Sequence, residues 1–140
     1  MGRREGDDCP IVNLLNIIGD KWTLLVVRDL ALKPRRTTEL LASLHPISSR
    51  TLLARLRDME AGELVSRRCF ESSPPRVEYE LTARGRLLLP LLDLMRRTGE
   101  SLCGERCDER QAEQGAYCDV CARRAPRTYR RAEADSIVLL

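Results

Sequence analysis

Residues 48–65 constrain the fold of this chain more than any other segment, because they combine a helix start, a helical apolar pattern and a helix end. Ser48 is of the residue type that caps helix N-termini, and Gly62 stands where such a helix would end. Four apolar side chains fall within about 120° of one another on a helical wheel: Leu52, Leu53, Leu56 and Met59. Arginines lie opposite or beside this stripe, so the segment predicts an amphipathic helix with one buried and one cationic face.

The segments around it predict a mainly α-helical fold with a small β-hairpin, in the α+β class. Helices are predicted over residues 11–18 after Pro10, 21–32 after the cap residue Asp20, 37–44 from Thr37 or Thr38, and 48–62. Strands are predicted over 63–70 and 77–81, with a tight turn at 72–76, followed by a long helix over 82–102 that begins at Thr82 and is kinked by Pro90. This order of elements is typical of a winged helix-turn-helix.

Length and composition fit one folded domain with a short arm and a tail. The chain has 140 residues, of which 43% are hydrophobic and 32% charged, as in folded globular proteins. We divide it into a flexible arm at 1–8, a domain at 9–102 and a cysteine-rich tail at 103–140. No apolar run approaches the roughly 20 residues that span a bilayer, and the start lacks the apolar stretch of a signal peptide. We therefore expect a cytoplasmic protein without membrane contact, whose thiols stay reduced.

Positive charge is concentrated before and within the predicted fourth helix. The net charge of the chain is only +3, which does not identify a nucleic-acid partner by itself. Between residues 35 and 57, however, there are five arginines against a single acidic residue, Glu39. A local positive field of this kind favours contact with a polyanion.

The fourth helix and the hairpin together favour binding to double-stranded DNA. Short side chains on the polar side of the helix permit close approach to a groove, and Arg50 can reach guanine or phosphate. Arg76 follows two prolines at the hairpin turn and suits the DNA backbone or minor groove. The expected DNA contacts are Arg35, Arg36, Ser48, Ser49, Arg50, Thr51, Ala54, Arg55 and Arg76. The helix alone would be explained better as a solvated amphipathic helix, and the basic hairpin is what favours DNA.

Four segments resemble the HxlR-type family of winged-helix transcriptional regulators, which are relatives of the MarR-like proteins. They are Cys9-Pro10, IGDKWTLLVVRDL at 18–30, ISSRTLLARLRDMEAGELV at 47–65 and PPRVEYELTARGRLLLPLLDLM at 74–95. The resemblance implies a homodimer that binds a palindromic operator and responds to an electrophile, an oxidant or a small metabolite. At MEAGELV the glycine stands one residue earlier than is usual in the family, and we expect the turn to shift with it.

A dimer is also expected from the residues themselves. One helical segment is apolar on nearly all sides: Leu87, Leu88, Leu89, Leu91, Leu92, Leu94 and Met95. The predicted helix at 11–18 is similarly rich in apolar residues. Together they exceed what one small domain buries, so we expect the same pair from a second copy to cover them. The alternative is that both helices belong only to the core of a single chain.

The cysteines outside the tail suggest one candidate sensor. Cys9 precedes the first helix, whose N-terminus favours the thiolate form, although the neighbouring Asp7 and Asp8 act in the opposite direction. The resembled family often keeps a reactive cysteine at this position, so Cys9 is a redox-sensing candidate, with an inert thiol as the alternative. We expect Cys69, at the end of the first hairpin strand, to contribute to packing.

The tail contains two close pairs of cysteines: Cys103, Cys107, Cys118 and Cys121. Such paired spacing fits a tetrahedral site in which each short loop directs two thiolates at one ion, so zinc is the leading prediction. An iron–sulfur cluster uses the same ligands, and dithiol switching or free cysteines are further alternatives. A structural zinc would fix a tail that is too small to fold alone.

Enzymatic activity is not expected. The sequence shows no nucleophile–base pair, no phosphate-binding loop and no metalloenzyme helix motif. The single histidine, His45, precedes a proline and suits a polar turn. We therefore expect a sequence-specific transcriptional regulator that acts as a repressor. The alternative is a protein–protein adaptor on the same fold, with the cysteine tail as its interaction module.

Overall fold

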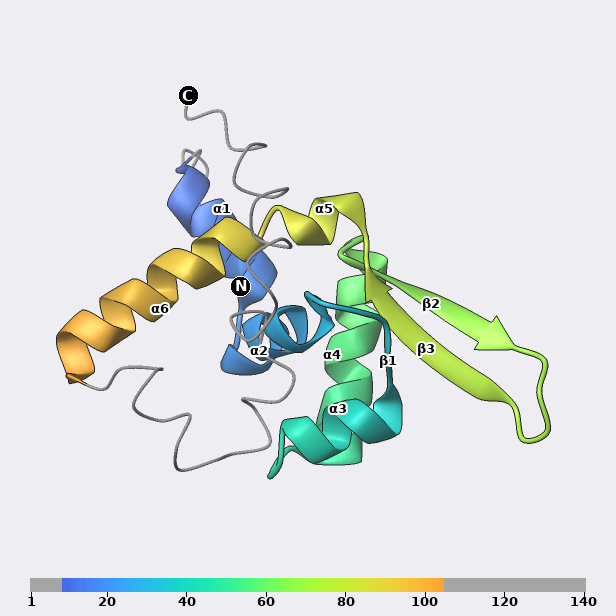
Figure 1. Cartoon of the computed structure of the whole chain (residues 1–140). Coiled ribbons are helices and arrows are strands. Elements are labelled where there is room, and N and C mark those ends of the chain that lie inside the picture. Colours follow the sequence, from blue (N-terminus) through green and yellow to red (C-terminus); the bar gives the residue numbers. More distant parts are fainter. Residues whose placement is uncertain (1–8, 105–140) are drawn as a thin grey trace.

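The computed structural model describes residues 9–104, which form six helices and a three-stranded sheet (Figure 1). The helices are α1 Pro10–Ile18, α2 Lys21–Leu30, α3 Thr37–Ser43, α4 Ser49–Ala61, α5 Ala83–Arg86 and α6 Leu89–Cys103. The strands are β1 Arg35–Arg36, β2 Val65–Phe70 and β3 Arg76–Leu81. The predicted fold class is confirmed: a mainly helical winged helix-turn-helix with a small antiparallel sheet.

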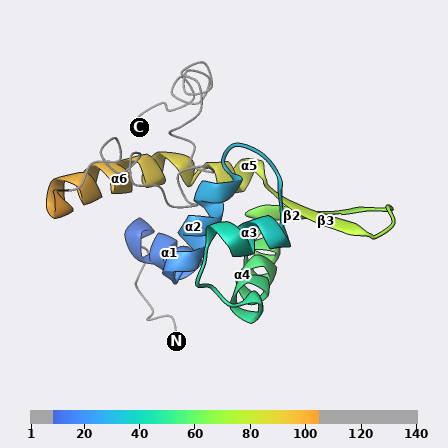
Figure 2. The same cartoon turned by 60° about the horizontal axis from the view of Figure 1, so that its bottom comes forward.

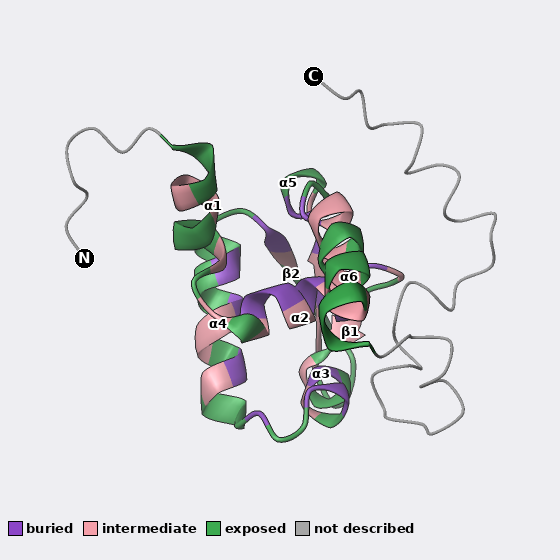
Figure 3. Ribbon diagram, turned by 90° about the vertical axis from the view of Figure 1, so that its left-hand side faces the viewer, coloured by how far each residue is buried: buried purple, intermediate pink, exposed green. Residues whose placement is uncertain are grey.

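The core forms around α2, the helix with the most buried residues (Figure 3). Its side chains pack against those of α3, α4, β3 and α6. The fully buried large apolar side chains are Val26, Val27, Leu30, Leu40, Leu44, Leu52, Leu56 and Met59. The predicted stripe on α4 is therefore the face that joins the core, with one exception. Leu53, which the sequence placed in that stripe, remains 36% exposed.

Three predicted helix caps are present and set where the helices begin. The Asp20 carboxylate accepts a hydrogen bond from the Thr23 N–H at 2.9 Å. Ser48 Oγ accepts from the Thr51 N–H at 3.1 Å. Thr82 Oγ1 accepts from the Gly85 N–H at 3.0 Å. Each bond satisfies a backbone donor that the first turn of a helix leaves free.

The sheet contains a strand that the sequence analysis did not predict. β3 lies at its centre, with β1 on one side and β2 on the other, and both pairs are antiparallel. Arg35 is paired with Tyr79, and Arg36 with Glu78. A strand of two arginines has neither alternation nor apolar character, so it carries no sequence signal of its own.

The predicted long helix with a kink at Pro90 is wrong. The chain forms two helices instead, α5 and α6, separated at Leu87 and Leu88. Pro90 occupies the first turn of α6, where a missing N–H costs no hydrogen bond and the fixed φ of proline suits a helix start. At Gly85 a side-chain Cβ would lie 2.1 Å from the Leu64 carbonyl oxygen, so this close contact between α5 and the start of β2 requires glycine.

The turn after α4 does not shift with its glycine, contrary to expectation. Gly62 has φ −81°, an ordinary value for any residue. Glu63 has φ +60° and takes the left-handed conformation that favours glycine. The left-handed conformation therefore lies at position 63, where a non-glycine residue adopts it at a cost in backbone free energy.

Cys69 also differs from the expectation that it would pack, because it is exposed on β2. Its strand partner Val77 is half-buried.

The β2–β3 hairpin, or wing, and α6 project from opposite sides of the body (Figures 1 and 2). Within residues 9–104 no single helix has both the length and the apolar content to cross a bilayer, although α1 and α2 pass that test as a pair bent by 80°.

Candidate nucleic-acid interface

The outward side of α4 carries a row of side chains that the rest of the described structure does not use. Arg50, Leu53 and Arg57 are all exposed and recur at i, i+3 and i+7, which places them along one side of the helix. Neither arginine forms an ion pair with any residue between 9 and 104. Ala54, beside this row, is half-buried. The row therefore offers two available guanidinium groups with small and apolar surface between them.

The N-terminal turn of α4 is fixed by its own side chains. Ser48 Oγ accepts from the Thr51 N–H and donates to Thr51 Oγ1 at 2.9 Å. The hydroxyl hydrogen of Thr51 is then available to a ligand, because a hydroxyl donates once and accepts twice. Ser49 and Arg50 are exposed at the same turn. The predicted cluster 48–51 is thus brought together at one exposed helix end.

Arg55 has a different environment from the one predicted for a DNA contact. Its Nη1 lies 2.6 Å from Asp20 Oδ2, and its Nη2 lies 2.9 Å from Asp58 Oδ2. These contacts tie α4 to the residue that caps α2. The hydrogen bond that Arg55 donates to Asp20 raises the pKa of Arg55. Partial burial by itself raises the pKa of Asp20, but the Thr23 N–H and the Arg55 guanidinium outweigh it and hold that pKa below its usual value.

Arg35 is likewise directed inward, with only 11% of its side chain exposed. Its Nε donates to the Asp29 carbonyl oxygen at 3.3 Å, and its Nη1 lies 4.0 Å from Glu39. The Asp29 carboxylate is fully buried, where it accepts from Ser43 Oγ and from Arg28 Nε at 2.8 Å. These contacts join α2 to β1 and α3, so in this conformation Arg35 positions the helix-turn-helix.

The arginines of the wing differ in whether they contact acidic side chains of the described residues: Arg68 and Arg76 do, and Arg67 does not. Arg76 lies 4.6 Å from the Phe70 ring centroid, and its Nε is 3.3 Å from Glu78. Arg68 Nη2 is 2.5 Å from Glu80. Arg67 is exposed and forms no ion pair among the described residues. Arg36, on the edge strand β1, is also exposed and unpaired within the described part of the chain.

The set of expected contacts omitted three residues that the structure exposes beside them: Leu53, Arg57 and Arg67. The helical spacing from Arg50 would have identified the first two. The alternation of side chains along β2 places Arg67 on the same face of the strand as Val65 and Cys69. It does not determine whether the rest of the protein covers that face.

The structure describes only part of the cysteine predictions. Cys9 is exposed at the N-cap position of α1. Cys103 is exposed at the last residue of α6, whereas Cys107, Cys118 and Cys121 lie outside residues 9–104. Within that range no group of three or more His, Cys, Asp or Glu side chains could hold a metal ion.

The terminal helices α1 and α6 have no buried residues (Figure 3). Their exposed large apolar side chains are Ile11, Leu15 and Ile17 on α1 and Leu94, Met95 and Leu102 on α6. Leu87, just before α6, is 76% exposed. The remaining apolar residues of the segment 87–95 are buried or packed against the core.

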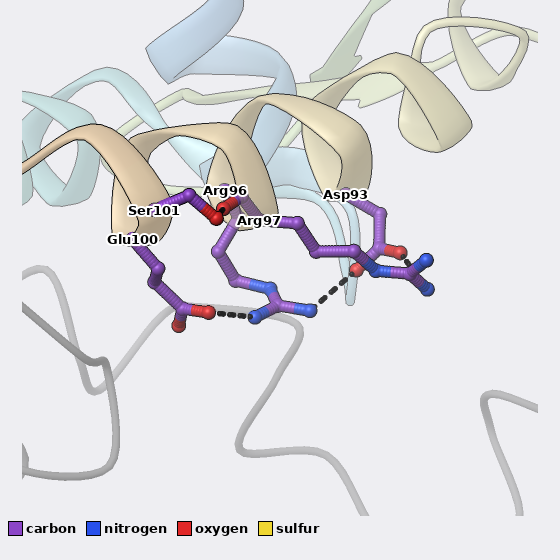
Figure 4. Close-up of polar contacts among 5 residues, drawn as sticks. All are labelled: Asp93, Arg96, Arg97, Glu100 and Ser101. Carbon is purple, nitrogen blue, oxygen red and sulfur yellow. Dashed lines mark hydrogen bonds and ion pairs between the residues drawn. The ribbon is translucent and has the colours of Figure 1, made fainter. Parts of the chain in front are cut away.

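The opposite side of α6 is occupied by polar side chains (Figure 4). Arg96 binds Asp93 at 3.1 Å and Glu100 at 3.0 Å, and Arg97 binds Asp93 at 2.8 Å. Met95 and Leu102 fall on the other side of the helix by their spacing. The helix is therefore amphipathic, with an apolar side that the described chain leaves uncovered.

The helix pair α3–α4, the three-stranded sheet and the arginines along α4 and the wing define a DNA-binding protein of the winged helix-turn-helix class, a transcriptional regulator of MarR-like type. The chain belongs to the HxlR-like helix-turn-helix family, which residues 17–106 match.

Known proteins agree with this assignment. An uncharacterized HTH-type transcriptional regulator from Synechocystis sp. is 43% identical over 94 residues, which are 67% of this chain and 70% of the relative. A structure assigned to the MarR family of transcriptional regulators, from Porphyromonas gingivalis, superposes with a TM-score of 0.65 at 30% identity, covering 70% of this chain and 96% of that one. The redox regulator HypR in its oxidized form gives a TM-score of 0.63 at 35% identity, covering 66% and 96%.

Proposed function

We propose that this protein binds a specific double-stranded DNA sequence as a homodimer, with α4 of each copy in the major groove and the wing on the adjacent backbone. The observation that carries the proposal is the row Arg50, Leu53 and Arg57, exposed and without ion pairs among residues 9–104. The row lies on a helix whose start is capped by Ser48 and whose middle is tied to Asp20 through Arg55. Exposed side chains on a fixed helix are what base recognition needs.

The side-chain types assign a contact to each position. Arg50 would donate two hydrogen bonds to guanine, and Leu53 would pack against a thymine methyl group. Ser49 and Thr51, at the helix start, suit backbone phosphates. Arg36 and Arg76 would position the protein on the backbone without reading sequence.

The homodimer is supported by the uncovered apolar sides of α1 and α6. A second copy that presents the same two helices would cover both in one symmetric interface. It would also place two α4 helices on one DNA molecule, as a palindromic operator requires. We further propose that the protein acts as a repressor, by occupying such an operator.

The signal that we propose is an oxidant or an electrophile sensed at Cys9. Support comes from the exposed thiol of Cys9 at the start of α1 and from the likeness to the redox regulator HypR. Cys9 would act by changing α1, and with it the dimer. If so, peroxide lowers DNA affinity of the wild type but not of Cys9→Ser, and equal loss in both would exclude Cys9 as the sensor.

For the tail we propose a structural zinc bound by Cys103 together with Cys107, Cys118 and Cys121, with an iron–sulfur cluster as the alternative. Metal analysis of protein purified without oxygen distinguishes them. One zinc per chain and no colour supports the first, and iron with visible absorbance supports the second. Absence of both metals contradicts the proposal.

The experiment that tests DNA binding is a selection of duplexes from a random library, followed by titrations over a range of salt concentrations. We expect the selected duplex to bind at least about 10³-fold more tightly than random DNA, with affinity falling steeply as salt rises. An adaptor would show no preference between the two, and that result would contradict the proposal.

A further inference from the structure

A hollow of about 440 Å³ lies between the start of α3 and the turn of the wing. Its lining includes Arg36, Thr37 and Thr38 from one side and Ser73 and Arg76 from the other. Figure 1 shows why these segments meet: β1 runs along β3 and leads directly into α3 beside the wing.

The register of the sheet places the two arginines on one face. Arg36 is opposite Glu78, and Arg76 lies two residues from Glu78 on the same strand. Side chains two apart on a strand, and side chains directly opposite across a pair, share a face. Arg36 and Arg76 are therefore diagonal neighbours on adjacent strands, within reach of one small group.

The chemistry of the hollow fits an oxyanion. Its lining contains two guanidinium groups and no Asp or Glu side chain. Arg36 has no ion pair among the described residues, and the Arg76 guanidinium lies over the Phe70 ring with its Nε 3.3 Å from Glu78. Thr37 and Thr38 add hydroxyl groups at the rim. Two guanidinium forks with hydroxyl donors suit a phosphate, whose oxygens accept several charge-assisted hydrogen bonds.

We propose that Arg36 and Arg76 bind one and the same backbone phosphate of DNA in this hollow, with the Thr37 and Thr38 hydroxyls as additional donors. The inference rests on the proposed function, which places α4 in the major groove. The first helix of a helix-turn-helix then crosses the backbone, and the wing lies on it as well. A single shared phosphate would fix the angle between the wing and the helix pair.

The test is a double-mutant cycle on the selected duplex. Arg36→Ala and Arg76→Ala are each expected to weaken binding roughly tenfold and to reduce the salt slope by about 1. Because both would contact one phosphate, the double variant should lose little more than either single variant. Arg68→Ala is the matched control, since it removes an arginine from the same face outside the hollow. Its loss should add to that of Arg36→Ala. Thermal unfolding checks that each variant is folded.

A scan with single neutral methylphosphonates identifies the phosphate itself. At one position, neutralisation should abolish the losses caused by both Arg36→Ala and Arg76→Ala. Additive losses, or losses that map to two different phosphates, would overturn the shared contact while leaving DNA binding intact. If inorganic phosphate alone binds the hollow and no methylphosphonate alters the losses, the hollow holds a free anion and the assignment to DNA is wrong. If the wild type prefers no duplex, the proposed function fails and this assignment with it.

Discussion

Arg50 and Arg55 lie on the same helix, yet their surroundings assign them different roles. Arg50 is exposed and unpaired among residues 9–104, whereas Arg55 is held between Asp20 and Asp58. A side chain with no intramolecular partner gives up no intramolecular contact when it binds a base, although it still loses hydration and rotamer freedom. A side chain with two carboxylate partners must give them up first. Arg50 is therefore the residue that we propose to read DNA, and Arg55 is the residue that ties α4 to α2.

Replacing Arg50 with alanine tests the first role. We expect Arg50→Ala to lose about 1–3 kcal/mol of binding free energy on the selected duplex and much less on random DNA, because a base contact distinguishes sequences and a phosphate contact does not. Equilibrium titration of both duplexes measures this. Arg84→Ala, which removes an exposed arginine from α5, is the control and should change neither. Equal losses on both duplexes would make Arg50 a phosphate contact.

The role of Arg55 can be tested through its partner Asp20, because the stability that this pair contributes depends on pH. Despite the opposing effect of partial burial, the Thr23 N–H and Arg55 keep the pKa of Asp20 below its usual value. A carboxyl with a lowered folded-state pKa stabilises the fold above its unfolded pKa, and this contribution is lost as pH falls through the folded pKa. Asp20→Asn keeps a good cap but removes the ion pair. We expect it to cost about 0.2–1 kcal/mol at pH 7.

The difference between wild type and Asp20→Asn should shrink as pH falls below about 4, as measured by urea unfolding at several pH values. Asp20→Ala also removes the cap and should cost about 1 kcal/mol more at neutral pH. A difference between wild type and Asp20→Asn that does not change with pH would contradict this account of the Asp20–Arg55 pair.

Among the elements, the turn between α4 and β2 contains one residue in an unfavourable backbone conformation. The left-handed residue is Glu63, although glycine stands one position earlier. A side chain in this conformation costs roughly 1–2 kcal/mol. The Glu63 carbonyl accepts from Thr82 Oγ1 at 2.5 Å, which links this turn to the start of α5 and helps to hold it.

Glu63→Gly should therefore stabilise the protein. Relief of the left-handed conformation is partly offset by the greater freedom of glycine in the unfolded chain, which leaves a net gain of up to about 1 kcal/mol. Glu60→Gly, in the last turn of α4, is the matched control and should lose about 1 kcal/mol. Chemical unfolding of the three proteins measures both effects. Destabilisation by Glu63→Gly would show that the turn gains more from the glutamate than its backbone costs.

The elements that the sequence predicted are those with strong local signals. Asp20, Ser48 and Thr82 begin their helices because each side chain satisfies a nearby backbone donor. The strand β1 was missed because two arginines become a strand only through pairing with β3. The break before α6 was misread as a kink, since proline suits the first turn of a helix as well as it disrupts an interior.

The helix that carries the candidate site could be predicted from the sequence, but the intramolecular partners of its arginines could not. The spacing of α4 placed Arg50 on the exposed side but Leu53 wrongly in the buried stripe. Nothing near Arg55 in sequence reveals Asp20 as its partner. The same holds for Arg35, whose acceptor is a backbone carbonyl of α2. Such contacts depend on how helices pack, which local patterns do not specify.

At the scale of the whole molecule, two surfaces lie at opposite sides of one body. The wing projects on one side, and α6 projects on the other with an uncovered apolar side (Figure 2). This separation allows a dimer to form through the terminal helices without covering the arginines of α4 and the wing. In the proposed dimer, a change at this surface would alter the spacing of the two α4 helices.

The proposed dimer predicts a specific loss of assembly and of DNA binding. Met95→Asp places a charge on the exposed apolar side of α6, where Met95 is 47% exposed. We expect it to yield monomers in analytical ultracentrifugation, because an unpaired charge is costly in a buried interface. Binding to a duplex with two half-sites should fall by at least about 10²-fold. Arg97→Asp, which places the same acidic side chain on the polar side of α6 beside Asp93, should leave the dimer intact. A Met95→Asp protein that remains dimeric would place the interface elsewhere.

Guanine N7 methylation interference on the selected duplex tests whether α4 lies in the major groove, because this atom lies there. We expect methylation to block binding at guanines in two half-sites about 10 base pairs apart, and expect this interference to disappear in Arg50→Ala. Tight binding with no major-groove interference, or an interference pattern that Arg50→Ala leaves unchanged, would contradict the conclusion that α4 reads the DNA.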